Sequence, residues 1–130
     1  MVWVGLSAAV LVLDEDLNLR LSIAQILKQA GYAVSTACSP CEALKQLSAH
    51  PFGLVFLDIG LMAGGEMALV SEIRHLYPYI PLLVLSPYLH SSAMFNDHPA
   101  QMVHFLVKPV DPVKILEVIQ SIIIGENRPA

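Results

Sequence analysis

The stretch LVFLD, residues 54–58, places a short apolar run, Leu54–Leu57, directly before an acid, Asp58. Apolar runs of similar length recur along the chain between turn signals, at Ala9–Leu13, Ala33–Ala37, Leu82–Leu85 and Val103–Val107. Short and nearly continuous apolar runs are typical of strands that are buried on both faces of a parallel sheet. Together these runs predict a parallel sheet of five buried strands.

Segments with helical periodicity separate the predicted strands. Apolar residues of the segment Leu19–Ala30 share one helical face, and Gly31 is a suitable stop signal. Ser39 is a candidate N-cap, with Pro40 at the first helical position and Glu42 completing a capping box. Further helices are expected at Glu66–Leu76, within Ser91–His98, and from Asp111–Pro112 to just before Gly125.

Alternation of strand and helix along 130 residues predicts a single α/β domain. The expected fold is a flavodoxin-like doubly wound (βα)5 three-layer sandwich, with right-handed crossovers and the strand order 2-1-3-4-5. We expect an N-terminal extension over residues 1–8, the folded domain over residues 9–124 and a C-terminal tail over residues 125–130.

Composition narrows the classes of function. The net charge is −4 and the seven Lys and Arg residues are scattered singly, which argues against a nucleic-acid-binding surface. No stretch reaches the apolar length of a membrane helix. The apolar start, Met1–Leu13, lacks a positively charged region and a credible cleavage site, so the expected location is the cytoplasm without membrane attachment.

Polar residues follow the predicted strands directly. Asp14 and Glu15 come after the first strand, Asp58 after the third, Ser86 after the fourth and Lys108 after the fifth. In an open doubly wound sheet, ligands bind at the carboxyl ends of the strands, so these side chains are expected to converge on one crevice. Any one of them could simply cap a loop or helix, but the placement of all of them at strand ends favours a shared site.

Such a cluster suggests its own chemistry. Carboxylates without a neutralising partner repel one another and call for a hard cation with oxygen ligands, for which Mg²⁺ is suited. A carboxylate beside that cation can attack a phosphoryl group and form an acyl phosphate. Lys108 would balance charge on the phosphoryl oxygens, and Ser86 could donate a hydrogen bond to one of them.

The strand ends also carry specific motifs, which are VLVLDED (Val10–Asp16), LVFLDIGLM (Leu54–Met62), PLLVLS (Pro81–Ser86) and FLVKP (Phe105–Pro109). Taken together, these motifs and their spacing resemble the receiver family of two-component response regulators, the CheY-like proteins. The resemblance covers the chain from Ala9 to about Ile124. It implies a domain that takes a phosphoryl group and relays the signal by changing shape.

The resemblance implies a role for each polar residue of the crevice. Asp58 would be the phosphoacceptor and a Mg²⁺ ligand. Asp14, Glu15 and the carbonyl of Gly60 would complete the Mg²⁺ site, and Lys108 would bind the phosphoryl group. The domain would catalyse only its own phosphorylation and dephosphorylation, so it would not be an enzyme in the usual sense.

The resemblance further implies a switch. Ser86 would be the switch hydroxyl and Phe105 the switch aromatic, with a cis bond between Lys108 and Pro109. Charge on Asp58 would draw Ser86 inward and let Phe105 rotate. This rotation would change the face formed by the fourth helix, the fifth strand and the last helix.

Protein partners follow from the same resemblance. A sensor histidine kinase, a phosphotransfer protein or a small phosphodonor would supply the phosphoryl group, and a downstream protein would read the changed face. The apolar start and Ile122–Ile124 suggest a patch that could pair with a partner or with a second copy in a homodimer. The chain is expected to act alone or as part of a longer protein.

A degenerate receiver, which keeps the fold as an interaction module without phosphorylation, is the main alternative. Glu15 stands where the family more often has Asp, Met62 where it has Pro, and Gly65–Glu66 where Asp-Gly is common. Glu15, Met62 and Pro87 support this alternative. The presence of Asp58, Lys108 and a hydroxyl at Ser86 argues against it.

A redox module is a second alternative, because Cys38-Ser39-Pro40-Cys41 follows a strand and opens a helix, where the helix dipole can activate a thiol. The motif would lie beside the edge strand, away from the acidic crevice, so a helix cap with two small thiols is the preferred interpretation. An enzyme of the same architecture is disfavoured because no glycine-rich phosphate loop is present. The histidines show no metal-ligand spacing: His50, His75, His90, His98 and His104.

Pro87 is the departure from the family pattern with the clearest consequence. Family members have a small residue here whose backbone N–H binds the phosphoryl group, and proline has no such donor. We therefore expect either that the phosphorylated state of this chain is stabilised less than usual or that its site is rearranged. The substitution Pro87→Ala should lengthen the lifetime of a phosphoryl adduct, measured by intact mass. Unchanged lifetime, phosphorylation rate and Mg²⁺ dependence would contradict this interpretation.

Overall fold

The computed structural model describes residues 9–58, 66–86 and 103–126 of the chain. Within these ranges the strands are β1 (Ala9–Leu13), β2 (Ala33–Ala37), β3 (Leu54–Asp58), β4 (Leu82–Ser86) and β5 (Val103–Val107). The helices are α1 (Leu17–Gln29), α2 (Pro40–Ala49), α3 (Glu66–Leu76) and α4 (Pro112–Glu126). The described part of the chain therefore has the predicted alternation of strands and helices.

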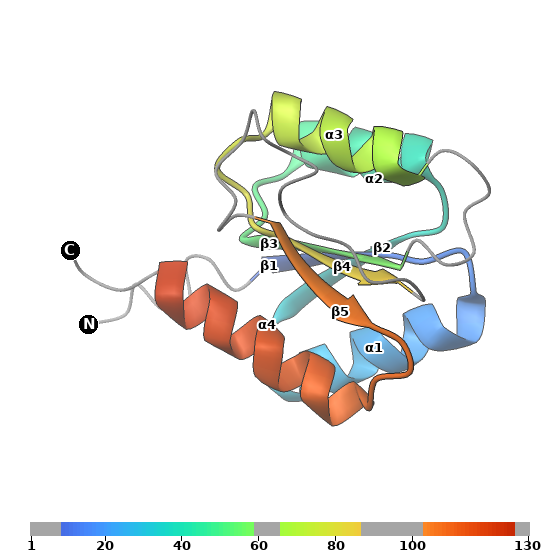
Figure 1. Ribbon diagram of the computed structural model, residues 1–130, viewed down its shortest axis with the longest axis vertical. Coiled ribbons are helices and arrows are strands. Elements are labelled where there is room, and N and C mark those ends of the chain that lie inside the picture. Colours follow the sequence, from blue (N-terminus) through green and yellow to red (C-terminus); the bar gives the residue numbers. More distant parts are fainter. Residues whose placement is uncertain (1–8, 59–65, 87–102, 127–130) are drawn as a thin grey trace.

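The strands form one parallel sheet in the order β2-β1-β3-β4-β5, which confirms the predicted order (Figure 1). Each of the four neighbouring pairs is parallel, so all carboxyl ends meet at one edge of the sheet. Two strands extend one residue further than predicted. Asp58 and Ser86 are thus the last residues of β3 and β4 rather than the first residues after them.

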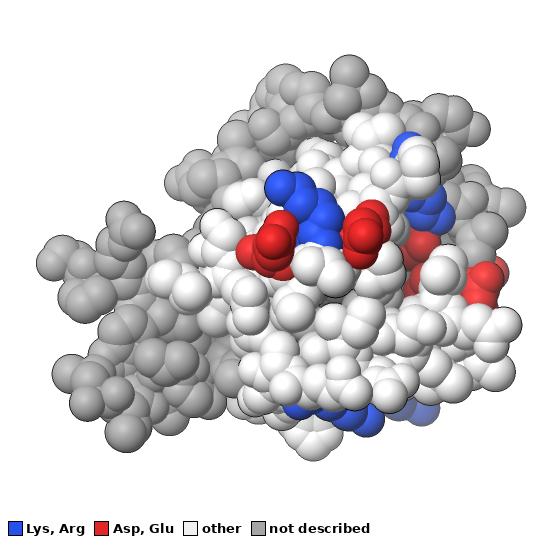
Figure 2. Space-filling model, turned by 90° about the horizontal axis from the view of Figure 1, so that it is seen from below, with Lys and Arg blue, Asp and Glu red and all other residues white. Residues whose placement is uncertain are grey.

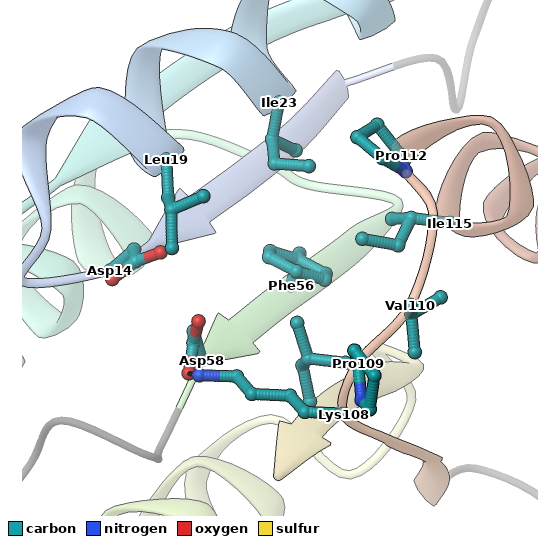
Figure 3. A pocket seen from close by; sticks show the side chains of 11 residues that line it. Asp14, Leu19, Ile23, Phe56, Asp58, Lys108, Pro109, Val110, Pro112 and Ile115 are labelled. Atoms are coloured by element: carbon teal, nitrogen blue, oxygen red, sulfur yellow. Dashed lines mark ion pairs between the residues drawn. The ribbon is translucent and has the colours of Figure 1, made fainter. Parts of the chain in front are cut away.

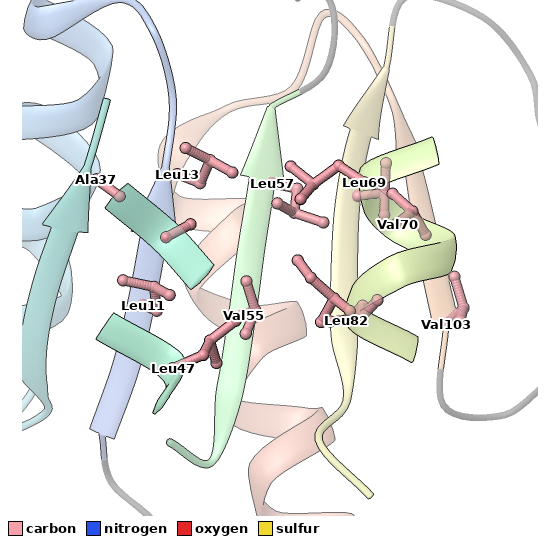
Figure 4. Packing of buried hydrophobic residues seen from close by; sticks show 13 residues of the cluster. Leu11, Leu13, Ala37, Leu47, Val55, Leu57, Leu69, Val70, Leu82 and Val103 are labelled. Carbon is pink, nitrogen blue, oxygen red and sulfur yellow. The ribbon is translucent and has the colours of Figure 1, made fainter. Parts of the chain in front are cut away.

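Each side of the sheet has its own apolar core, because successive side chains of a strand point to opposite sides. On the side covered by α2 and α3, residues such as Leu11 and Val55 pack against these helices (Figure 4). On the side covered by α1 and α4, Val12 and Phe56 belong to a second cluster. These layers confirm the predicted three-layer sandwich.

The C-terminus of α1 is capped as its sequence predicts. Gly31 has a positive φ of 102°, a conformation that glycine adopts without strain. The N–H of Gly31 donates to the carbonyl of Lys28 at 3.0 Å, and the N–H of Tyr32 donates to that of Leu27 at 3.1 Å. These are the two hydrogen bonds of a Schellman motif, which turns the chain into β2.

The N-terminus of α2 begins with the predicted N-cap. Ser39 is extended (φ −149°, ψ 157°), and its Oγ accepts a hydrogen bond from the N–H of Glu42 at 3.2 Å. This is one half of the predicted capping box. The carboxylate of Glu42 accepts a hydrogen bond from the thiol of Cys38 at 3.5 Å instead of reaching back to the cap.

The remaining helices agree with the sequence except at one end. α3 has the predicted bounds, and α4 begins at Pro112 as predicted. α4 then continues through Gly125 to Glu126, although a stop before Gly125 was expected. Glycine weakens a helix by about 1 kcal/mol relative to alanine but does not forbid it. The helix expected within Ser91–His98 and the segments 1–8 and 127–130 lie outside the described residues.

The side of the molecule that carries α1 and α4 has few charges in view. Figure 2 shows it from below, with charged side chains near the centre, at the right and along the lower edge, and uncharged side chains between them. Several large apolar side chains of these helices are exposed: Leu17, Leu19, Leu21, Val113 and Ile124. Among the described helices, none is both long and apolar enough to cross a membrane.

Arg74 of α3 is fully buried. Its guanidinium donates from Nη1 to the carbonyl of Pro78 at 2.8 Å and from Nη2 to the carbonyl of Ile80. A buried charge is tolerated only where hydrogen bonds replace its lost hydration. Arg74 therefore links the end of α3 by hydrogen bonds to the turn that leads into β4.

Replacing the guanidinium by a hydrocarbon, Arg74→Leu, should lower the free energy of unfolding by about 2–3 kcal/mol, because two carbonyls lose a charged donor. Urea denaturation monitored by circular dichroism would measure the change. His75→Leu at the exposed neighbouring position is the matched control, and its effect should stay within about 0.5 kcal/mol. Equal stabilities of the two variants would show that Arg74 has no such role.

Candidate functional site

The carboxyl edge of the sheet brings together residues from three separate segments. Asp14 follows β1 directly, Asp58 ends β3, and Lys108 follows β5. Figure 3 shows the two acids at the ends of the neighbouring strands β1 and β3, with Lys108 reaching across to Asp58. These residues, predicted from the sequence as part of one crevice, therefore lie together.

An ion pair joins Lys108 to Asp58. The distance from Lys108 Nζ to Asp58 Oδ1 is 2.6 Å, and the side chain of Asp58 is 1% exposed. A buried carboxylate needs such a partner, because it has lost its hydration. The backbone N–H of Lys108 also donates to the carbonyl of Ser86 at 2.8 Å, which fixes the loop after β5 to the end of β4. The Lys108–Pro109 bond is cis, as predicted.

Asp14 lies beside this ion pair and is itself 1% exposed. Its Oδ1 accepts a hydrogen bond from the N–H of Asp16 at 2.9 Å. Burial raises the pKa of Asp14 to about 6, and the negative charge of Asp58 acts in the same direction. The hydrogen bond from Asp16 and the positive charge of Lys108 lower this pKa but do not offset the effect of burial.

Two residues close to Asp14, which the sequence analysis did not identify, stabilise the loop after β1. The side chain of Asp16 caps α1, with its Oδ1 accepting from the N–H groups of Asn18 and Leu19. Arg20 donates from Nη1 to the carbonyl of Asp14 at 2.8 Å. An acid just before a helical pattern is a recognisable capping signal, whereas no sequence signal identifies the contact of Arg20.

Ser86 and Phe105 are related through the sheet. Ser86 is buried at the end of β4, and Phe105 is half-buried in β5 opposite Val84. Ser86 and Val84 are two residues apart, so their side chains point to the same side of the sheet. Phe105 packs against the core on that side, beneath α2 and α3. The hydroxyl and the aromatic ring are therefore on one side of neighbouring strands.

Glu15 does not join the other two carboxylates. It is exposed, although it follows buried Asp14 directly in the loop after β1. Within residues 9–58, 66–86 and 103–126, no three His, Cys, Asp or Glu side chains are grouped so that they could hold a metal ion. The prediction that all three carboxylates converge is therefore wrong for Glu15. Gly60, the remaining predicted Mg²⁺ ligand, lies outside the described residues.

The two acids that do converge fit a hard divalent cation. Asp14 and Asp58 supply carboxylate oxygens, and Lys108 offsets only one of their two negative charges. Mg²⁺ prefers oxygen ligands and commonly binds through one or two carboxylates while it keeps several waters. The donor set at this crevice therefore suits Mg²⁺ held by Asp14 and Asp58.

A cavity of about 290 Å³ opens from the crevice into the space between α1 and α4 (Figure 3). Its polar end is formed by Asp14, Asp58 and Lys108. The rest of its lining is apolar: Leu19, Ile23, Phe56, Leu85, Pro109, Val110, Pro112 and Ile115. Leu19, predicted to share the apolar face of its helix, is 45% exposed and forms part of the cavity wall.

The cysteines and the histidines of the described residues do not line this crevice. Cys38 and Cys41 are free thiols, both exposed, at the start of α2 beside the edge strand β2. His50 and His75 are exposed and His104 is half-buried in β5. His90 and His98 lie outside the described residues.

Known proteins share this sequence pattern. The transcriptional regulatory protein ZraR of Salmonella typhimurium is 28% identical over 112 residues, which span 86% of this chain and 25% of that protein. A putative NtrX-like response regulator of Rickettsia bellii is 30% identical over 110 residues, which span 82% of this chain and 23% of that protein. The chain thus spans about a quarter of the length of these curated relatives.

Solved structures share the fold, and a family profile matches most of the chain. Chemotaxis protein CheY4 of Vibrio cholerae has a TM-score of 0.75 at 25% identity, covering 89% of this chain and 98% of that one. NtrX of Brucella abortus has a TM-score of 0.78 at 25% identity, covering 92% of this chain and 27% of that one. The profile of the response regulator receiver domain matches residues 10–120. The chain therefore belongs to the receiver-domain family of two-component response regulators.

Proposed function

We propose that this receiver domain accepts a phosphoryl group on Asp58 in a Mg²⁺-dependent reaction. The observation that supports this role is the 2.6 Å ion pair between Asp58 and Lys108, formed at the carboxyl edge of the sheet beside buried Asp14. A buried carboxylate whose pKa is raised, as that of Asp14 is, is typical of functional sites. The cavity that adjoins them gives a small molecule access to the carboxylate.

In the proposed reaction a carboxylate oxygen of Asp58 attacks the phosphorus of the donor. The bond between phosphorus and the donor's leaving group breaks, and its electron pair departs with that group. The Lys108 ammonium then turns from the free carboxylate to the phosphoryl oxygens, where its charge is needed. A Mg²⁺ ion held by Asp14 and Asp58 would neutralise charge on the transferred group.

The proposed response begins at Ser86. A phosphoryl group on Asp58 presents acceptor oxygens near the end of β4, and the Ser86 hydroxyl donates to one of them. Because Ser86 and Phe105 lie on the same side of neighbouring strands, movement of the hydroxyl changes the space available to the ring. The altered surface around β5 would then be read by a partner protein.

The donor is proposed to be a sensor histidine kinase or a phosphotransfer protein, since these serve two-component response regulators. A downstream protein or an effector domain is proposed to read the phosphorylated state. A homodimer through the apolar end of α4, where Ile124 is 63% exposed, is a further proposal.

Incubation with Mg²⁺ and acetyl phosphate should add a single phosphoryl group to the protein, measured by intact mass. The adduct should be absent from Asp58→Asn and from a sample with EDTA, because each lacks a required component. Asp111→Asn is the matched control, since Asp111 is an exposed acid outside the crevice, and it should be labelled like the original protein.

The outcome separates the proposed function from its main alternative. An adduct that depends on both Asp58 and Mg²⁺ would establish a working receiver. Absence of any adduct on a folded protein, with a known receiver labelled in parallel, would instead identify an interaction module that keeps the fold without phosphorylation. Labelling of Asp58→Asn would show that another residue is the acceptor.

Asp14 should destabilise the metal-free protein at neutral pH. Its folded-state pKa of about 6 exceeds the ordinary value of 3.8, so the folded state binds more protons than the unfolded state between these values. The stability contributed by protonated Asp14 is present below about pH 4 and is lost as the pH rises through about 6. Asp14→Asn keeps the acceptor for the Asp16 N–H but removes the charge.

In EDTA, Asp14→Asn should therefore raise the free energy of unfolding by about 2 kcal/mol at neutral pH, and the gain should vanish toward about pH 4. Urea denaturation across this range would measure it. Asp111→Asn should leave the free energy of unfolding within about 0.5 kcal/mol at each pH. A gain that is independent of pH, or a loss at neutral pH, would contradict the assignment of a buried charge to Asp14.

A further inference from the structure

The cavity between α1 and α4 has the proposed attacking carboxylate at one end and apolar side chains along the rest of its wall. Asp58, the proposed acceptor, and Lys108 form part of its wall at one end. In Figure 3 the side chains of Ile23, Pro112 and Ile115 lie at the opposite end. Apart from Asp14, the described lining that remains for the rest of a molecule presenting a phosphate to Asp58 and Lys108 is apolar.

The size of the cavity restricts what can fill it. Its volume of about 290 Å³ is at the lower limit of small-molecule sites, which occupy roughly 300–1,000 Å³. Its apolar walls come from well-packed elements, because Ile23, Phe56 and Ile115 are each less than 7% exposed. A short hydrocarbon chain suits these walls, whereas a second anionic group among the described apolar lining residues would lose its hydration without finding a partner.

We propose that this cavity is a leaving-group subsite, which holds the hydrocarbon chain of a small acyl phosphate while its phosphoryl group faces Asp58. The proposal rests on the proposed function of Asp58 and adds a substrate class to it. It follows that donors with a short apolar acyl chain phosphorylate the domain faster than acetyl phosphate, whose single methyl group leaves most of the apolar wall uncovered.

The direction of the cavity agrees with the geometry of the transfer. In a phosphoryl transfer the attacking and leaving oxygens lie roughly in line on opposite sides of phosphorus. A leaving group therefore points away from the Asp58 oxygen that attacks. Asp58 follows Phe56 by two residues on β3, so both side chains face the side of the sheet on which the cavity extends toward α1 and α4.

The transfer balances without a further reactant. A carboxylate oxygen of Asp58 forms a bond to phosphorus, and the bond between phosphorus and the acyl oxygen breaks. The electron pair of that bond leaves on a carboxylate, so the products are a phosphorylated Asp58 and a short-chain fatty acid anion. No proton or electron is required.

Leu19 provides a way to change the cavity from its rim. It lines the cavity but is 45% exposed, so a larger side chain at this position can be accommodated without disturbing a core. Leu19→Trp should fill part of the apolar space, and Leu19→Ala should enlarge it. Leu21 lies on the same helix, is 53% exposed and does not line the cavity, so Leu21→Trp is the matched control.

The test compares acetyl phosphate with butanoyl phosphate in the presence of Mg²⁺, by intact mass over time. Acetate and butanoate are leaving groups of nearly equal basicity, so a difference in rate reports contact with the protein. Two additional buried methylene groups should raise the second-order rate constant about tenfold. Leu19→Trp should bring the ratio of the two rates close to one, and Leu21→Trp should leave the ratio unchanged.

Leu19→Ala extends the test in the opposite direction, because an enlarged cavity should shift the preference from butanoyl toward hexanoyl phosphate. Equal rates for acetyl and butanoyl phosphate on the original protein would overturn the subsite while leaving Asp58 as the acceptor. A preference for butanoyl phosphate that survives in Leu19→Trp would also overturn it. If none of these donors labels Asp58, the proposed function itself fails.

Discussion

A carboxylate buried at the end of the central strand is the constraint on which the crevice depends. Asp58 ends β3, which has β1 on one side and β4 on the other, so its side chain is almost inaccessible to water. An isolated charge there would be strongly destabilising. The Lys108 ammonium at 2.6 Å offsets this effect. Because Lys108 belongs to the loop after β5, the ion pair also holds that loop over the end of β4. There the backbone N–H of Lys108 donates a hydrogen bond to the carbonyl of Ser86.

The buried acids of the crevice lower the stability of the fold, although the proposed function requires them. One ammonium offsets one carboxylate, so Asp14 remains as a second buried acid beside the pair, with a pKa raised mainly by burial. A closed core would replace such an acid by an apolar residue, and the sheet would gain stability. The excess of negative charge at this crevice is compatible with a bound cation. The destabilising feature of the crevice is therefore the one that suits it to Mg²⁺ and phosphoryl chemistry.

The sequence predicted the parts of the structure that follow from local patterns, and it missed those that depend on packing. Strand order, the end of α1 at Gly31 and the N-cap at Ser39 follow from apolar periodicity and capping chemistry, which act over a few residues. Asp14, Asp58 and Lys108 could be placed together because parallel strands end at one edge. The buried role of Arg74 could not be predicted, because it depends on a turn that α3 reaches only in the folded chain. The sequence also did not predict that Glu15 is exposed, because the direction of a side chain beyond the end of a strand depends on the conformation of the loop.

The period of two along each strand separates the two tasks that we propose for the domain. Asp58 lies two residues after Phe56, so its carboxylate belongs to the side of the sheet that α1 and α4 cover. Ser86 lies two residues after Val84, so its hydroxyl belongs to the side that carries Phe105, α2 and α3. The acid and the hydroxyl end neighbouring strands at one edge, yet they open toward different cores. A donor held against the first core and a response transmitted through the second would not compete for the same space, and this separation arises from strand geometry rather than from any single motif.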